Sequence, residues 1–292
     1  GWTVDGEGKA MHKSLGNGVD PADIFNKYGA DILRLWAASA DYHADVRCSD
    51  AIFKQLSQNY LKFRNTARYC LGNLDGFDPN NLVAPADMLE LDRWAVTRLN
   101  ALIEKCAQAY NDYEFLVVTH AVNDFCVVEL SNFYLDIIKD RLYVEKPDSV
   151  SRRAAQTAIY RILRDMTLVF APILAFTCEE IWANLPQSVD HDPEACVFNE
   201  MPKGGNSKET AEFMAKWERI RKVRDDVNKA LENARNQKTI GKSLEAMVQL
   251  TADGELYDFL KENEEMLAQV FIVSQVQLHQ QAVAQQHHGK LI

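Results

Sequence analysis

The chain has 292 residues, of which 47% are hydrophobic and 25% are charged, and its formal net charge is −10. This composition is ordinary for a globular protein that builds proper hydrophobic cores, and no apolar run approaches the roughly 18 residues that a membrane span requires. The acidic balance argues against sequence-blind binding to nucleic acid, which needs a broad positive surface, but it leaves room for RNA contact through a local basic stripe.

The six cysteines are dispersed along the chain, and none forms a C-x-x-C pair. Single cysteines inside amphipathic helical patterns behave as small hydrophobic core residues in a reducing compartment. We therefore predict neither a disulfide framework nor a metal site in this chain. The cysteines are Cys48, Cys70, Cys106, Cys126, Cys178 and Cys196.

A basic loop flanked by glycines lies near the start of the chain, at residues 9–18. Its Lys13 carries a compact ammonium group that suits phosphate as a point charge. Glycines on both sides give the backbone access to positive φ, so that the loop can swing and close over a bound nucleotide. A solvated hairpin tip has the same appearance, and this pattern by itself does not separate the two interpretations. The flanking glycines are Gly6, Gly8, Gly16 and Gly18.

The middle of the chain predicts antiparallel helices. Asp20 followed by Pro21 is typical of a helix start, and from Ser49 to about Leu185 apolar residues recur every three or four positions. The expected helices cover residues 52–74, 87–109, 114–139 and 150–171, the last ending at Pro172 because proline lacks an N–H group. A short final helix follows, with Thr177 and Glu180 expected to form its capping box.

A different pattern begins after a stretch rich in proline and glycine. A long charged helix is expected over residues 210–236, followed by strands at 245–250 and 270–276 around a helix at 255–269. The predicted fold is mainly α, an antiparallel helical bundle with a short N-terminal loop and helix segment and a small C-terminal α+β unit. The predicted domains are 1–48, 49–190, a linker at 191–206, and 207–292.

The loop sequence Ala10-Met11-His12-Lys13-Ser14 resembles the K-M-S-K-S loop of class I aminoacyl-tRNA synthetases. Two positions differ from that pattern. Ala10 stands where the first lysine is expected, with Lys9 one place earlier, and His12 replaces a serine. The resemblance supports Lys13 as the residue that contacts phosphate, and it leaves the role of the first lysine open.

Longer phrases resemble the isoleucine branch of these enzymes more closely than the valine or leucine branches. They are Asp92-Arg93-Trp94, the segments 125–143 and 151–163, and the segment 223–246, which reads VRDDVNKALENARNQKTIGKSLEA. The chain is therefore similar to the C-terminal part of bacterial isoleucyl-tRNA synthetases, from the mobile loop through the anticodon-binding domain. The nearest alternatives are a valyl- or leucyl-tRNA synthetase fragment and a helical scaffold with no enzymatic role.

The resemblance implies an ATP-dependent ligase of the cytoplasm that forms isoleucyl-adenylate and transfers isoleucine to its tRNA. ATP with Mg²⁺ and isoleucine would bind the catalytic domain, most of which lies outside this sequence, so we expect this chain alone to be inactive. Residues 10–14 would form the ATP-binding loop and Lys13 would stabilise phosphate charge. The resemblance further implies a monomer that binds tRNA and no membrane.

Candidate RNA contacts lie on two basic segments. Arg64 and Arg68 share a helix face at i, i+4 spacing, and two guanidinium groups so placed can bind successive phosphates; a solvated face held by ion pairs is the structural alternative. Bases could stack on exposed aromatic rings, for which Trp182, Phe198 and Trp217 are candidates. The predicted tRNA-binding residues are Lys62, Arg64, Asn65, Arg68, Lys238 and Lys242.

Overall fold

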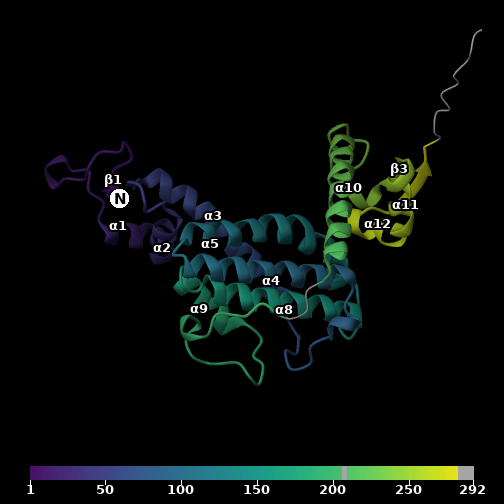
Figure 1. The fold of residues 1–292 in the computed structure, drawn as a ribbon, viewed down its shortest axis with the longest axis horizontal. Coiled ribbons are helices and arrows are strands. Elements are labelled where there is room, and N and C mark those ends of the chain that lie inside the picture. The colour runs from purple at the N-terminus through teal and green to yellow at the C-terminus, as the bar shows by residue number, and fades with distance from the viewer. Residues whose placement is uncertain (206–208, 282–292) are drawn as a thin grey trace, which may run out of the picture. The chain divides into compact units, whose positions relative to one another are not determined.

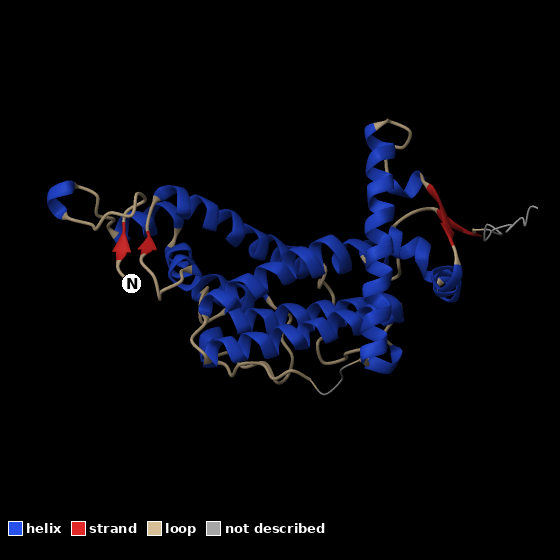
Figure 2. Ribbon diagram, turned by 45° about the horizontal axis from the view of Figure 1, so that its top comes forward, coloured by secondary structure: helices blue, strands red, loops and turns tan. Residues whose placement is uncertain are grey.

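The structure is a computed structural model that describes residues 1–205 and 209–281. Two compact units make up the chain, Gly1–Glu209 and Thr210–Ile292 (Figure 1). Figure 2 shows that the described residues are mostly helical, with strands confined to two short pairs. The prediction of a mainly α-helical fold is confirmed.

The first unit begins with a loop held on a small parallel strand pair. Strands β1 (Thr3–Val4) and β2 (Val46–Arg47) pair in parallel. Between them lie a 3₁₀ turn and two helices, and the first helix starts as predicted, with the Asp20 carboxylate accepting a hydrogen bond from the Ala22 N–H at 2.9 Å. These elements are η1 (Lys13–Leu15), α1 (Pro21–Tyr28) and α2 (Ala30–Ser39).

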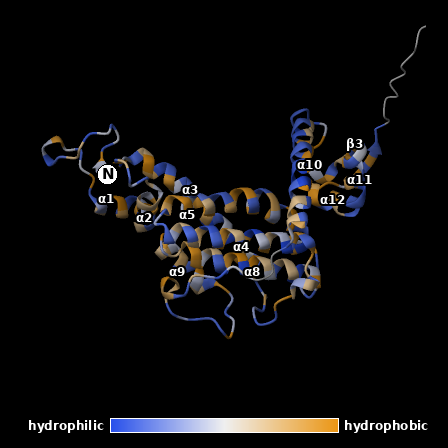
Figure 3. Cartoon of the chain, in the orientation of Figure 1, coloured by the Kyte–Doolittle hydropathy of each residue, from blue (hydrophilic) through white to orange (hydrophobic). Residues whose placement is uncertain are grey.

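The rest of the first unit is a helical bundle in which α4 packs against both α5 and α8. Since only residues 112–114 join α4 to α5 and the two pack together, they run antiparallel. Figure 3 shows hydrophobic and hydrophilic residues interspersed along these helices, as amphipathic packing requires. The bundle elements are α3 (Asp50–Gly72), η2 (Pro85–Asp87), α4 (Glu90–Asn111), α5 (Phe115–Asp124), η3 (Phe125–Tyr134), α6 (Leu135–Ile137), α7 (Lys139–Tyr143), α8 (Val150–Phe170), α9 (Ala175–Asn184) and η4 (Cys196–Phe198).

The third predicted helix, over residues 114–139, differs from the structure in its interior. Its middle part, η3, is π-helical, and it continues through α6 and α7 to Tyr143. Periodicity of 3.6 residues cannot reveal such a stretch, because the buried residues Phe125, Cys126, Leu130, Phe133 and Tyr134 recur at spacings of three and four that an α-helix also shows. π-Helical segments are rare and often occur at functional sites.

The break between α8 and α9 is closed by a side chain from another helix. The predicted capping box of Thr177 and Glu180 is wrong, because Thr177 lies inside α9, whose N-cap position is Leu174. The first-turn N–H groups of Phe176 and Thr177 instead donate to the carboxylate of Asp31 on α2, at 3.3 and 2.7 Å. A cap from 146 residues away leaves no signature in local sequence.

A buried ion pair joins four parts of the bundle. Arg141 of α7 donates both terminal N–H groups to the carboxylate of Asp92 on α4, at 2.8 and 2.7 Å, and the two side chains are 3% and 0% exposed. The Tyr134 hydroxyl of η3 donates to the same carboxylate at 2.8 Å. Arg141 also donates to the hydroxyl and carbonyl of Ser151 on α8, at 3.0 and 2.7 Å. Each polar group in this network is therefore satisfied.

The second unit carries a long helix and two parallel strands linked by two helices. Residues Met247 to Ala252 pair in register with Gln275 to Gln280, a parallel arrangement that requires a crossover connection. The predicted strand at 270–276 is displaced, since Val270 and Phe271 are buried in the last turn of a helix that ends at Ile272, whose φ is 56°. The elements are α10 (Ala211–Asn236), η5 (Ser243–Glu245), β3 (Met247–Ala252), α11 (Gly254–Glu262), α12 (Glu264–Phe271) and β4 (Gln275–Gln280).

Residues 191–205, expected to form a linker, lie along the bundle of the first unit. The Trp182 indole N–H donates to the Asp192 carbonyl at 3.1 Å, and the Gly205 N–H donates to the Asn100 side chain at 3.2 Å. The predicted domain boundaries stay predictions. The last expected unit includes residues 207, 208 and 282–292, which, like residue 206 of the linker, lie outside the described residues.

All six cysteines are buried and free. Burial raises the pKa of the Cys106 thiol to about 11 and that of Cys126 to about 12. Within residues 1–205 and 209–281, no helix is long and apolar enough to cross a membrane, and no group of three or more His, Cys, Asp or Glu side chains could hold a metal ion.

We expect Asp92→Ala to destabilise the bundle by about 3–5 kcal/mol, because it leaves the Arg141 guanidinium buried without its partner. Urea unfolding followed by circular dichroism measures this free energy. Lys54→Ala is the control, since it removes an ion pair whose lysine is 67% exposed and should change stability by less than about 1 kcal/mol. Equal losses for both variants would contradict a central role for the buried pair.

Candidate nucleotide loop and nucleic-acid interface

The loop at residues 9–18 is closed at its base by Asn17 and Asp5. The Asn17 side chain donates to the Asp5 carboxylate at 2.9 Å and to the Ala10 carbonyl at 3.0 Å, and it accepts from the His12 N–H at 2.8 Å. The Asn17 hydrogen bond, together with N–H donors from Lys9 and Glu7, lowers the pKa of Asp5 below its ordinary value of 3.8. The Asp5 carboxylate therefore stays ionised at neutral pH and keeps the two sides of the loop base hydrogen-bonded to each other.

The tip of the loop presents Lys13 to solvent. One 3₁₀ turn, Lys13–Leu15, ends at Gly16 with φ of 63°, a left-handed conformation that glycine adopts without strain. Met11, half-buried, packs on the core cluster of Ile24 and Phe53 and so anchors the loop to the helices behind it. The predicted loop residues are thereby brought together, with Met11 inward and Lys13 outward.

The two lysines of the loop differ in their surroundings. Lys9 forms an ion pair with Glu7 at 2.9 Å. Lys13 is exposed and forms no ion pair with any residue that the structure describes. Lys13 is therefore the loop cation whose charge is available to an anionic ligand.

The predicted basic residues of α3 are exposed and carry uncompensated charge. Lys62, Arg64 and Arg68 all reach solvent, and none forms an ion pair within residues 1–205 and 209–281. These three residues therefore lack the ion pairs that the structural alternative, a solvated helix face, would include. Unneutralised cations on a chain of net charge −10 form a local positive surface of the kind that phosphate binding needs.

A groove runs along one side of α3, against η3, α6 and α7. Its volume is about 450 Å³, and it brings Lys62 and Asn65 together with Lys139, whereas Arg64 and Arg68 lie outside it. The Lys139 ammonium pairs with Asp136 at 2.9 Å. The remaining lining residues are Thr66, Tyr69, Val127, Ser131 and Leu135.

An exposed aromatic ring lies close to this groove. Tyr143, at the end of α7, is 61% exposed, and its hydroxyl donates to that of Tyr69, a groove residue, at 3.2 Å. Burial, followed by this hydrogen bond, raises the pKa of Tyr69, which therefore stays neutral. Sequence reasoning missed Tyr143 and Lys139, because the π-helical segment that places them opposite α3 has no sequence signature.

The three aromatic residues chosen from the sequence as candidates for base stacking differ in their exposure to solvent. Trp182 and Trp217 are core residues, 3% and 2% exposed, and are too buried for base stacking. Phe198 is 77% exposed in η4. Amphipathic periodicity alone could not separate an exposed ring from a buried one.

The predicted contacts in the second unit lie at one turn after α10. Lys238, with φ of 59°, and Lys242 are both exposed. The turn is held by Glu245, whose carboxylate accepts from the N–H groups of Gly241 and Lys242 at 2.8 and 3.2 Å, which lowers its pKa. Arg235 donates to the Ser243 hydroxyl at 2.8 Å. The two lysines thus lie at a turn that these hydrogen bonds hold in place.

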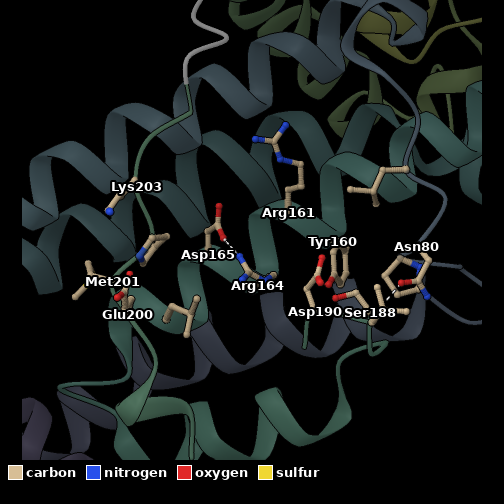
Figure 4. A pocket seen from close by; sticks show the side chains of 15 residues that line it. Asn80, Tyr160, Arg161, Arg164, Asp165, Ser188, Asp190, Glu200, Met201 and Lys203 are labelled. Atoms are coloured by element: carbon tan, nitrogen blue, oxygen red, sulfur yellow. Dashed lines mark hydrogen bonds and ion pairs between the residues drawn. The ribbon is translucent and has the colours of Figure 1, made fainter. Parts of the chain in front are cut away.

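A cleft of about 810 Å³ is formed by α8, the loop around Pro79 and the segment 188–203. Figure 4 shows Arg161, Arg164 and Asp165 projecting into it, with Arg164 paired to Asp165 at 2.9 Å. Three basic and three acidic side chains line it, so it carries no net charge to select an anion or a cation. The other charged lining residues are Asp190, Glu200 and Lys203.

Two family models match the chain. Residues 1–49 match class I tRNA synthetases of the I, L, M and V group, and residues 92–250 match the anticodon-binding domain of tRNA ligases. The second match covers more than half of the chain, and it includes η3, α6 and α7, which line one side of the groove, whereas α3 lies outside it. The chain belongs to the family of anticodon-binding domains of tRNA ligases.

The curated relatives are isoleucine–tRNA ligases. The chain is 50% identical to that of Syntrophotalea carbinolica over 280 residues, 47% identical to that of Caldanaerobacter subterraneus and 49% identical to that of Moorella thermoacetica. These alignments cover 95–96% of this chain and 30% of each relative, so the chain spans about a third of their length.

A solved structure of a related kind has a similar fold. LeuRS of Agrobacterium radiobacter K84, in a ternary complex with tRNA and LeuAMS, matches 73% of this chain and 24% of that chain with a TM-score of 0.55 and 18% sequence identity. At this level of identity the likeness concerns the fold alone.

We expect Asn17→Ala to raise the pKa of Asp5 toward its ordinary value, because the largest cause of the lowered value is removed. In the unaltered chain, the Asp5 carboxylate stabilises the hydrogen-bonded base of the loop at any pH above the ordinary carboxyl pKa. This stabilisation is lost as the pH falls through the lowered pKa of Asp5. Carboxyl chemical shifts in an NMR titration measure the change. Asn26→Ala, at an exposed position on α1, is the control; an unchanged Asp5 titration in Asn17→Ala would disprove the assignment.

Proposed function

We propose that this chain is the anticodon-binding part of an isoleucine–tRNA ligase together with its mobile ATP-phosphate loop. The observation that carries the proposal is the uncompensated basic face of α3, next to the groove and Tyr143, on a chain that is otherwise acidic. The isoleucine–tRNA ligases that are about half identical over nearly the whole chain support isoleucine as the amino acid.

RNA would bind on α3 through phosphate contacts first. Arg64 and Arg68 offer planar guanidinium groups for successive phosphates, and Lys62 adds a point charge at the groove. Single-stranded bases are recognised by stacking and by hydrogen bonds to their edges. Tyr143 supplies an exposed ring for stacking, and Asn65 supplies both a donor and an acceptor. The partner would be the tRNA that accepts isoleucine.

Lys13 would act in the activation step, in which isoleucine and ATP form isoleucyl-adenylate and release pyrophosphate. Its ammonium group stabilises negative charge that develops on the phosphates, an electrostatic role with no covalent bond to the enzyme. Met11, anchored in the core, and Gly16 would let the loop tip close on ATP. Mg²⁺ would arrive with the ATP phosphates, and amino-acid selection would rest on parts of the ligase beyond this chain.

The alternative functions, a helical scaffold or a ligase for valine or leucine, predict different surface properties. A helical scaffold does not require uncompensated cations on one helix, and a valyl- or leucyl-tRNA ligase would share the fold with different tRNA preference. We propose that the ligase works as a monomer in the cytoplasm and that this chain alone does not catalyse the reaction.

We expect Lys62→Ala and Arg68→Ala each to weaken binding of an isoleucine tRNA transcript and to reduce the slope of log K against log salt by about 1, because each removes a phosphate contact. Titration at two or more salt concentrations measures both quantities. Lys105→Ala, an exposed lysine on α4, is the matched control. Valine tRNA and an anticodon-swapped transcript test selectivity. Equal effects at Lys62 and Lys105 would argue for unspecific charge, and equal binding of all transcripts would favour the scaffold.

In the complete ligase, we expect Lys13→Ala to lower the rate of isoleucine-dependent ATP–pyrophosphate exchange by about 10²–10³, the typical cost of losing one preorganised electrostatic contact. Affinity for tRNA should not change, since the RNA face lies on α3. Lys9→Ala is the matched control, and because Lys9 is already paired with Glu7 its effect should be much smaller. Comparable losses for the two lysines would contradict the assignment of Lys13.

A further inference from the structure

One turn of α2 holds both ends of the α8–α9 break. The carboxylate of Asp31, 7% exposed, accepts from the N–H groups of Phe176 and Thr177 at the start of α9 and from the Thr177 hydroxyl at 2.5 Å. An anionic acceptor at a helix N-terminus satisfies free N–H groups and interacts favourably with the helix dipole.

Arg34, one turn later on the same helix, satisfies the other side of the break. Its guanidinium donates to the carbonyls of Pro172 and Ile173, both at 2.8 Å. These carbonyls follow the end of α8, where acceptors have no partner within a helix and favour a cation. Asp31 and Arg34 thus form a clamp of opposite charges across the break that Pro172 creates.

The clamp is in contact with α3 on one side and, through α2, with the core cluster behind the Lys13 loop on the other. The Thr177 hydroxyl also forms a hydrogen bond of 2.9 Å with the Tyr60 hydroxyl on α3, the helix that carries the basic face. On the other side, Ile32 of α2 lies in the core cluster on which Met11 of the loop packs. A continuous set of contacts therefore runs from the Lys13 loop through α2 to α9 and α3.

We propose that Asp31 and Arg34 are positioning residues that fix the Lys13 loop relative to the RNA-binding face of α3. Neither residue belongs to the proposed phosphate-binding or RNA-binding groups, so their role is indirect. They act because α2 is one of the elements through which the N-terminal segment contacts the bundle, and the clamp supplies the charged hydrogen bonds between α2 and the α8–α9 break. A second contact joins α1 to the start of α3, where Lys27 and Tyr28 donate to the Asp50 carboxylate. This inference rests on the proposed function for its consequence in catalysis, whereas its structural part can be tested without any activity.

The structural test measures the distance between the loop and α9 by pulsed electron paramagnetic resonance of two spin labels. Labels at Gly18→Cys and Ala183→Cys report this distance, since both positions are exposed and all six native cysteines are buried. We expect Asp31→Ala/Arg34→Ala to broaden or shift the distance distribution. A pair at Ala101 and Ala183, both in the bundle, should stay unchanged. An unaltered loop distance in a folded double variant would overturn the proposal.

Single variants guard against loss of folding. Arg34→Gln removes the charge at an exposed position, and Arg34→Lys keeps the charge with fewer fixed donors, so Lys should restore part of the distribution that Gln loses. Arg153→Ala is the matched control, because its guanidinium also donates to a backbone carbonyl, that of Asn81, at 2.9 Å but does not involve α2. An equal effect of Arg153→Ala and Arg34→Gln would overturn the proposal.

In the complete ligase, the clamp variants should lower kcat for tRNA aminoacylation by about tenfold, because misplacing a reacting group by about 1 Å can cost up to about 10²-fold. The KM for tRNA should stay within about twofold, because binding groups on α3 are untouched. A rise in KM with unchanged kcat would overturn the positioning role. An unaltered ligase that neither activates isoleucine nor binds its tRNA would instead refute the proposed function, and the distance measurement would still decide the clamp.

Discussion

The buried pair of Asp92 and Arg141 is the constraint around which the bundle is organised. Taking two charges out of water is costly, and only complete hydrogen bonding makes it tolerable. That requirement ties α4, η3, α7 and α8 to one another, since Tyr134 and Ser151 must both be in place to satisfy the pair. Because α7 follows the π-helical segment after only the short α6, the same pair sets where Tyr143 and Lys139 emerge beside α3.

Charge is used differently inside the bundle, at its break and on its surface. The interior pair is fully satisfied, and the α8–α9 break is closed by opposite charges that complement two helix ends. On the surface, Lys13, Lys62, Arg64 and Arg68 form no ion pair with any residue that the structure describes, although the chain is acidic overall. In the folded chain, the charged groups that hold elements together are therefore paired. The cations that could bind phosphate remain exposed to solvent.

Local patterns predicted much of the fold. Asp20 before Pro21, the apolar stripe of α3 and the proline that ends α8 act within a few residues, so the sequence shows them directly. The loop around Lys13 was also predicted, because its glycines and lysines are neighbours in the chain. The expected capping box at Thr177 and the strand at Val270 were wrong, because a distant carboxylate and burial of a short apolar run decided those places.

The sequence by itself determined the helical class, the loop that presents Lys13, and basic residues at helical spacing on α3. Only the tertiary structure decided which cations are free of ion pairs, which aromatic rings are exposed, and that Asp31 and Arg34 of α2 close a break about 140 residues further along the chain. The physical reason is range: helix propensity and turn chemistry depend on neighbours, whereas burial, ion pairing and capping across elements depend on which surfaces meet after folding.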